Sequence, residues 1–217
     1  MQSLTFKSSS DQGLQILCLG AHCDDIEIGC GASLLRLFRE QEIASVEWVI
    51  FASTPERKAE ALKSAGRFLK GIPDSRVQIH DFRDGYLPAA WSQVKDIFEK
   101  IRKECSPDII FTHFREDMHQ DHRLLSELTW NTFRNHLILE YEIPKYDGDL
   151  KHPNFFIPAD IKTVTLKKEI LLSCFKSQLE KHWFDEALIT SLMRIRGVES
   201  ASPSGYAEAF HVRKMVL

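Results

Sequence analysis

The stretch LCLGAHCDDIEIGCGAS, from Leu17 to Ser33, joins an apolar run to a group of ionisable side chains. The apolar run extends from Leu14 to Gly20, as is typical of a central strand in a parallel sheet. Four polar or ionisable residues follow it at once: His22, Cys23, Asp24 and Asp25. Open α/β sheets bind their ligands outside the carboxyl ends of the strands. This stretch therefore predicts both a fold class and the place of a site.

Length and composition narrow the class of protein. The chain has 217 residues, of which 43% are hydrophobic and 27% charged, as is ordinary for a globular protein with a substantial core. Its net charge of -3 gives no basic field for nucleic acid. We expect no membrane span, because no apolar run approaches the ~20 residues required. The polar N-terminus and five cysteines without paired spacing lead us to expect a cytoplasmic protein with reduced thiols.

Strand-like and helix-like segments alternate along the chain. Strands are predicted at 14–20, 45–53, 76–82 and 107–113, with a closing strand in the tail from residue 207. Helices are predicted at 32–42, 55–71, 91–104, 119–134, 163–178 and 184–195. This alternation predicts an α/β fold with a Rossmann-like open, mostly parallel sheet and helices on both faces. We expect one domain over residues 1–217.

A second polar cluster follows the strand that ends at His113. The sequence HFREDMHQDH covers residues 113–122, and its histidines at positions 119 and 122 can share one helix face. A catalytic zinc ion takes three protein ligands, commonly histidine nitrogens and carboxylate oxygens, and leaves one position for water. A histidine and an aspartate from the first cluster and a histidine from the second fit that pattern. The spare aspartate can then accept a proton from water, and the spare histidine can stabilise an oxyanion.

These motifs resemble those of the LmbE-like, or PIG-L type, zinc de-N-acetylases. AHCDDIEIGCG and HQDH are similar to the family motifs A-H-P-D-D and H-x-D-H. Four further segments are similar to family features in the expected order: PERKAEALKSAG, DFRDGYLP, PDIIFTH and YAEAFHV. The resemblance thus covers nearly the whole chain. It implies an enzyme, a metal-dependent deacetylase that acts on the linear amide bond of an N-acetylated sugar and releases acetate.

The resemblance also implies roles for individual residues. The implied ligands of one zinc ion per chain are His22, Asp25 and His122. Asp24 is the implied general base and His119 the implied oxyanion stabiliser. Asp121 would orient His119, and Arg57 would contact the substrate. Taken without the resemblance, an aspartate after a strand is more often a helix N-cap, and Arg57 with Glu60 can be a simple ion pair on a helix surface.

Two further features lie in or directly after the first motif: Cys23 and the glycines of the segment GCGAS. Cys23 stands where the family usually has proline, and we expect its thiol to point away from the metal. The glycines of GCGAS are expected to let a loop turn sharply and bring the next helix close to the sheet. A dinucleotide site is rejected, because G-x-G-x-x-G is absent.

The segment from Tyr141 to Pro158 is the candidate for substrate selection. Its aromatic residues are expected to stack on a sugar face: Tyr146 above all, and also Tyr141, Phe155 and Phe156. Lys145, Asp147 and Asp149 are expected to bind hydroxyl groups or to contact an anionic aglycone. An ordinary packed surface loop is the alternative.

The sequence leaves three functions open. They are a sugar deacetylase, a related amidase on a non-sugar or thiol-conjugate amide, and a non-catalytic ligand-binding protein. Family members often assemble, so a homo-oligomer is an expectation that the sequence leaves open. We expect a small N-acetyl sugar, and no nucleic acid, as the partner.

Overall fold

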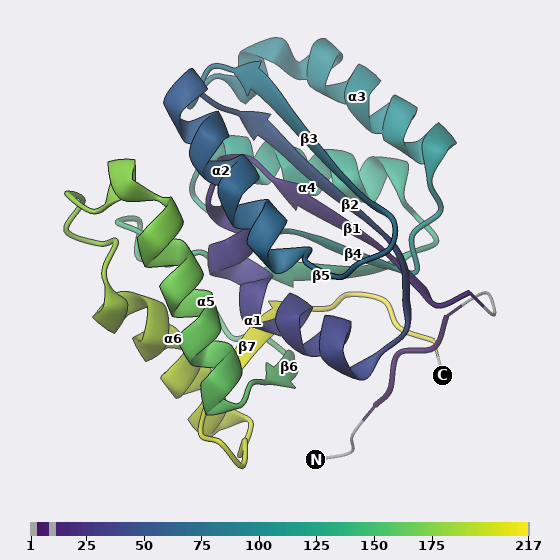
Figure 1. Ribbon diagram of the computed structural model, residues 1–217. Helices are drawn as coiled ribbons and strands as arrows, with labels where there is room; N and C mark the ends of the chain where they lie inside the picture. Colours follow the sequence, from purple (N-terminus) through teal and green to yellow (C-terminus); the bar gives the residue numbers. More distant parts are fainter. Residues whose placement is uncertain (1–3, 9–11, 217) are drawn as a thin grey trace.

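A seven-stranded sheet with helices on both faces forms the protein, as seen in the computed structural model of Figure 1, which describes residues 4–8 and 12–216. The strands are β1 (Leu14–Gly20), β2 (Ile43–Ala52), β3 (Ser75–Phe82), β4 (Ile109–His113), β5 (Leu137–Tyr141), β6 (Phe155–Pro158) and β7 (Ala207–His211). The helices are α1 (Asp25–Glu40), α2 (Pro55–Phe68), α3 (Trp91–Glu104), α4 (Gln120–Thr132), α5 (Ile161–Cys174) and α6 (Glu186–Glu199). The predicted fold class is confirmed. The single-domain organisation stays a prediction.

The strand order β3-β2-β1-β4-β5-β7-β6 places β1 beside β4. Strands β1 to β5 are parallel, whereas β7 runs antiparallel to both of its neighbours. The chain leaves β1 toward one edge of the sheet and returns at β4 to build the other. Ligand sites in open sheets form at such a reversal. The two polar clusters therefore meet at adjacent carboxyl ends.

Alternate residues of β1 serve two separate cores. Ile16 and Cys18 face the core under α1, α2 and α5, whereas Leu17 and Leu19 face the core under α3 and α4. Figure 1 shows these two groups of helices on opposite faces of the sheet. Burial on both faces explains why β1 is an uninterrupted apolar run.

Helix α1 starts earlier than predicted. It begins at Asp25, not at residue 32, so Gly29 and Gly31 lie inside the helix and the predicted sharp loop is wrong. A Cβ at Gly29 would lie 2.2 Å from the Tyr141 ring. The glycine thus permits close approach of α1 to the sheet, which is the part of the expectation that holds.

Side chains of β7 and α5 form hydrogen bonds with the backbone of helix α1. Inside α1, the N–H groups of Ala32 and Ser33 donate to the Glu208 carboxylate of β7 at 2.9 and 2.7 Å. Lys167 of α5 donates to the Ile28 carbonyl at 2.7 Å and pairs with Glu208 at 2.6 Å. These contacts tie the middle of α1 to α5 and β7.

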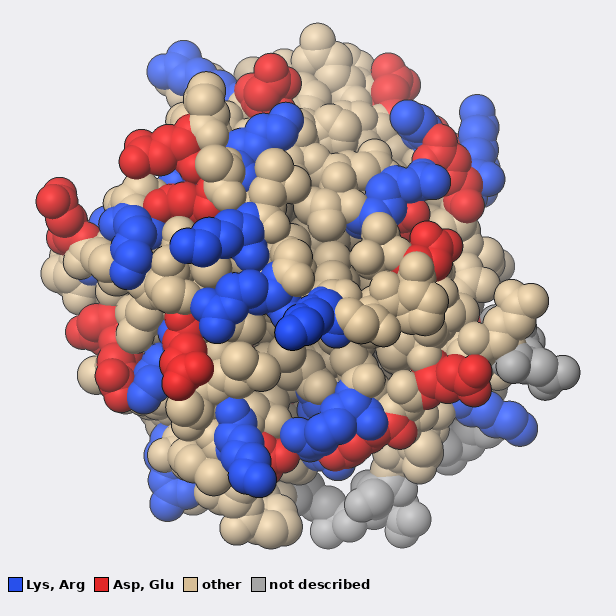
Figure 2. Space-filling view, in the orientation of Figure 1, with Lys and Arg blue, Asp and Glu red and all other residues tan. Residues whose placement is uncertain are grey.

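The surface agrees with the small net charge. Basic side chains gather over α2 and α5 in Figure 2, with acidic side chains among and beside them. Within the described residues, none of the helices has the length and apolar character needed to cross a membrane.

Candidate metal centre

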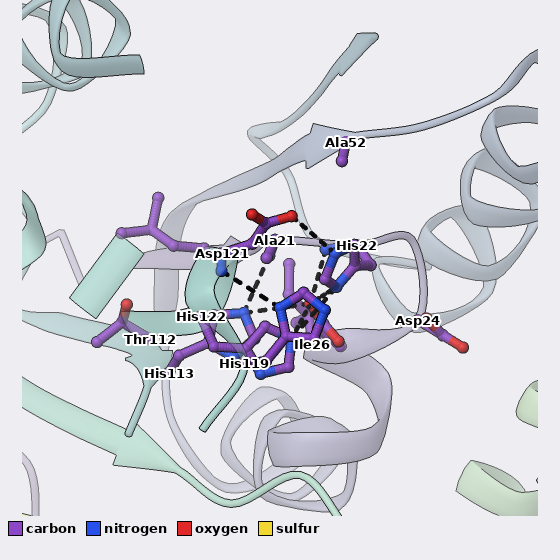
Figure 3. A network of polar contacts seen from close by, with 12 residues as sticks. Ala21, His22, Asp24, Ile26, Ala52, Thr112, His113, His119, Asp121 and His122 are labelled. Carbon is purple, nitrogen blue, oxygen red and sulfur yellow. Dashed lines mark hydrogen bonds and ion pairs between the residues drawn. The ribbon is translucent and has the colours of Figure 1, made fainter. Parts of the chain in front are cut away.

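The predicted ligands come from two segments of the chain, and each segment runs from the end of a strand into the start of a helix. His22 lies in the turn after β1, and Asp25 is the first residue of α1. His122 lies in the first turn of α4, which follows β4. Figure 3 shows the imidazole rings of these segments converging on one small volume.

Three ligand atoms form a compact triangle. His22 Nδ1 lies 3.3 Å from Asp25 Oδ2 and 3.2 Å from His122 Nε2, and the third side, from His122 Nε2 to Asp25 Oδ2, is 3.6 Å. Ligands at roughly 2.0–2.2 Å around a tetrahedral ion stand about 3.3–3.6 Å apart. The triangle therefore has the dimensions of three ligands of one tetrahedral ion.

Neighbouring residues widen the set of groups that could hold a metal ion. Among the residues that the structure describes, ligand atoms within 4.8 Å of one another occur in three overlapping sets. These sets are His22, His119 and His122; Asp25, His113 and His122; and His22, Asp84, His119 and Asp121. The triangle takes its members from the first two sets, and the third is partly exposed because it contains Asp84.

The ionisation of two triangle members suits metal binding. Burial and the neighbouring His113 lower the pKa of His122 to about 4, so its imidazole is neutral near pH 7. Burial opposes ionisation of Asp25, but the surrounding His122, His113 and His22 hold its pKa well below its usual range. A neutral imidazole and a carboxylate are the forms that coordinate metals.

Each histidine of the triangle has a carboxylate behind it. Asp117 Oδ2 lies 2.9 Å from His122 Nδ1, and Asp121 Oδ2 lies 3.3 Å from His22 Nε2. Such carboxylates fix the ring orientation of metal-binding histidines and raise their basicity.

The carboxylate of Asp121 has a different partner from the one predicted. We expected it to orient His119, but its hydrogen bonds go to His22 and to the N–H groups of Gly85 (2.7 Å) and Leu87 (3.0 Å). His119 Nδ1 accepts the backbone N–H of Asp121 at 3.2 Å instead, as the N-cap of α4. The turn after β3, which the sequence did not connect to either motif, decides this arrangement.

His113 is fully buried at the end of β4. Its Nε2 accepts the Ala21 N–H at 2.9 Å. This contact ties His113 to the loop that carries His22, and the same Nε2 also lies 3.2 Å from Asp25 Oδ2, a corner of the triangle.

Asp24 faces away from the imidazoles (Figure 3). Its Oδ1 lies 2.7 Å from Arg57 Nη2, while its Oδ2 is buried and has no hydrogen-bond partner among the described residues. Burial raises the pKa of Asp24, and Arg57 opposes that shift. Arg57 therefore supports a site carboxylate, a contact that the sequence did not predict.

The ion pair that the sequence suggested between Arg57 and Glu60 is long, with 3.9 Å between Nε and Oε2. Glu60 instead accepts hydrogen bonds from the Ser177 N–H at 2.8 Å and the Ser177 hydroxyl at 2.6 Å. The reading of these two residues as a simple helix-surface pair is therefore wrong.

The thiol of Cys23 is buried and lies 3.7 Å from the Ala52 carbonyl oxygen. Burial raises its pKa to about 12. Over residues 4–8 and 12–216, it belongs to none of the metal-capable sets.

The segment from Tyr141 to Pro158 is more internal than expected. Tyr141 is fully buried and donates to the Leu19 carbonyl at 2.6 Å, so its expected role in sugar stacking is wrong. Lys145 pairs with both Asp117 and Asp149, so these two loop side chains are engaged with protein groups rather than directed at substrate hydroxyl groups. Tyr146 remains 68% exposed, and its ring lies edge-on to His182 at 5.0 Å.

Comparison with known families and relatives agrees with the geometry. The family described as PIG-L, GlcNAc-PI de-N-acetylase, matches residues 17–133, which contain both motifs. The chain is 32% identical over 145 residues to YaiS, an uncharacterised deacetylase of Escherichia coli (strain K12); the match covers 63% of this chain and 78% of YaiS.

Solved structures share the fold at low sequence identity. The N,N'-diacetylchitobiose deacetylase of Pyrococcus horikoshii has a TM-score of 0.69 and 19% identity over 93% of this chain and 84% of its own. The zinc-inhibited form of the teicoplanin deacetylase Orf2 has a TM-score of 0.69 and 14% identity, covering 93% and 98%. GalB, a 4-carboxy-2-hydroxymuconate hydratase of Pseudomonas putida KT2440, also reaches 0.69, with 15% identity over 94% and 98%. The fold alone therefore does not determine the reaction.

Proposed function

Because the chain belongs to the PIG-L family of GlcNAc-PI de-N-acetylases, we propose that it is a zinc-dependent hydrolase that removes the acetyl group from an N-acetylated amino sugar or its conjugate. Deacetylase activity is the established property of the family. The metal, the residue roles and the sugar are our proposals. The triangle of His22 Nδ1, Asp25 Oδ2 and His122 Nε2, with sides of 3.2–3.6 Å, carries the proposal.

The donor set fits zinc. Two imidazole nitrogens and one carboxylate oxygen are typical of a catalytic zinc site, and an all-oxygen set would favour magnesium or calcium instead. His22, Asp25 and His122 would hold one ion per chain. When bound, zinc lowers the pKa of a coordinated water and polarises a substrate carbonyl.

We assign the proton transfers to Asp24, the carboxylate of the first motif that lies outside the ligand triangle; because its side chain contacts Arg57 in this structure, the assignment requires the carboxylate to turn toward the metal centre. Its Oδ2 is buried without a hydrogen-bond partner in the described part of the chain, and Arg57 fixes the opposite oxygen. The carboxylate accepts the proton lost by the attacking water as the new carbon–oxygen bond forms. It then delivers that proton to the amide nitrogen as the carbon–nitrogen bond breaks, so the products are a free amine and acetate.

His119 is assigned the stabilisation of the oxyanion. Its Nδ1 accepts the Asp121 N–H, which leaves the ring proton on Nε2 and makes that atom the donor toward the substrate. Burial lowers the pKa of His119, in keeping with a neutral donor. A preorganised donor stabilises charge that develops only in the transition state.

The sugar is supported by the family and by the names of relatives, including the chitobiose deacetylase. Tyr146 is our candidate for stacking on the sugar, because its ring is exposed on the segment that also carries Lys145.

The test combines metal analysis with an acetate-release assay. The panel holds N-acetylated free sugars, sugar conjugates, thiol conjugates and N-acetyl amino acids, and His122→Ala is the control. We expect about one zinc per chain and acetate release from a sugar that the control does not release. Release only from non-sugar amides would indicate the related amidase. Zinc-free protein with no release would indicate a binding protein.

A further inference from the structure

A buried cluster of one lysine between two carboxylates lies directly behind the ligand His122. Lys145 Nζ is 2.9 Å from Asp117 Oδ2 and also forms an ion pair with Asp149 Oδ2. The side chains of Asp117, Lys145 and Asp149 are 3%, 10% and 6% exposed. Lys145 and Asp149 come from the loop 142–154 between β5 and β6.

The two carboxylates also hold the backbone that leads into α4. Asp149 Oδ2 accepts the Met118 N–H at 2.7 Å, and Asp117 Oδ1 accepts the His119 N–H at 2.8 Å. Asp117 Oδ2 lies 2.9 Å from His122 Nδ1. The cluster therefore contacts both histidines of the second motif, one through its ring and one through its backbone.

We propose that Lys145 is a positioning residue for the metal centre: its ammonium group holds Asp117 against His122 and thereby couples the loop 142–154 to the metal ligand. This inference rests on the proposed metal site. It gives Lys145 a role in metal affinity, where the sequence suggested a role in binding the substrate.

Charge explains why the lysine is needed. Two carboxylates that share one ammonium group in a nearly buried position repel each other strongly once that cation is removed. Moving apart relieves the repulsion, and Asp117 then loses its geometry on His122. Loss of the carboxylate behind a metal-binding histidine typically weakens metal affinity by about 10–100-fold.

The experiment measures the dissociation constant of zinc by competition with a chromogenic chelator, which requires no substrate. Lys145→Met should weaken zinc binding by about 10–100-fold. Lys151→Met is the matched control in the same loop, where the side chain is exposed, and should stay within about threefold of the wild type. Lys145→Arg keeps the charge and should bind zinc clearly more tightly than Lys145→Met.

The double variant Lys145→Met/Asp149→Asn separates charge from packing. It restores the formal charge of the cluster, so we expect it to recover affinity over Lys145→Met. It also serves as the test if Lys145→Met does not fold, with zinc binding expected within about tenfold of the wild type. Wild-type affinity in Lys145→Met, or no recovery in the double variant, would overturn the inference. A wild-type protein that binds no zinc would instead overturn the proposed function.

Discussion

Arg57 of helix α2 holds the carboxylate of Asp24, with 2.7 Å between Nη2 and Oδ1. The two side chains are 18% and 6% exposed, so the pair is shielded from water on most sides. The sequence led us to expect that Arg57 contacts the substrate. The structure shows instead a contact that can orient the proposed general base.

Arg57→Met should therefore lower kcat by about 10–100-fold, because a misplaced catalytic group loses that order of rate. Zinc content should be unchanged. Steady-state kinetics on the best substrate measure kcat and KM separately, and Lys63→Met on the exposed face of α2 is the control. A raised KM with unchanged kcat would return Arg57 to substrate binding.

His119→Ala should keep its zinc and lose about 10²–10³-fold in kcat, since it removes a donor aimed at the developing oxyanion. The product should bind nearly normally, because that charge is absent from the ground state. Zinc analysis, turnover and product titration together make the test. An unchanged kcat would remove His119 from the mechanism.

Tyr146→Ala should raise KM about 3–10-fold and leave kcat unchanged, as expected when an interaction is equal in the ground and transition states. The thermal midpoint should not change, because the side chain is 68% exposed. Tyr146→Phe retains the ring and should retain the KM. Equal KM values in all three proteins would exclude the proposed stacking.

Cys23→Ala should keep zinc and keep activity within roughly tenfold, which corresponds to about 1.4 kcal/mol in the barrier. The thiol contacts the Ala52 carbonyl and lies in none of the metal-capable sets that the described residues form. Metal analysis of the purified variant is the measurement. Loss of the metal would show that the thiolate is a ligand.

The local sequence pattern predicted where the two polar clusters lie in the fold. The apolar runs that end at Gly20 and His113 placed both clusters at strand ends, and the parallel pairing of β1 with β4 brings them together. The start of α1 was predicted too late, because glycines at positions 29 and 31 normally indicate a turn. Gly29 lies inside the helix because the Tyr141 ring packs against it, and this tertiary contact is not visible in the local sequence.

Side-chain partners could not be predicted in the same way. Asp121 turns to His22 because the turn at Gly85 and Leu87 comes from a distant part of the chain and fixes the carboxylate. Lys145 is likewise buried through a contact with a distant segment, since its ammonium group pairs with Asp117. Such choices depend on tertiary contacts between segments far apart in sequence, which no local motif records.

The division of labour between two adjacent aspartates is the central claim, and zinc bound per chain in Asp24→Asn and Asp25→Asn tests it most directly. Asp25 Oδ2 lies in the ligand triangle, whereas Asp24 faces Arg57. We predict that Asp24→Asn retains about one zinc per chain and loses about 10²–10⁴ in rate. Asp25→Asn should be depleted of zinc and partly rescued by excess metal. Equal depletion of both variants, or rescue of Asp24→Asn by added zinc, would contradict the account.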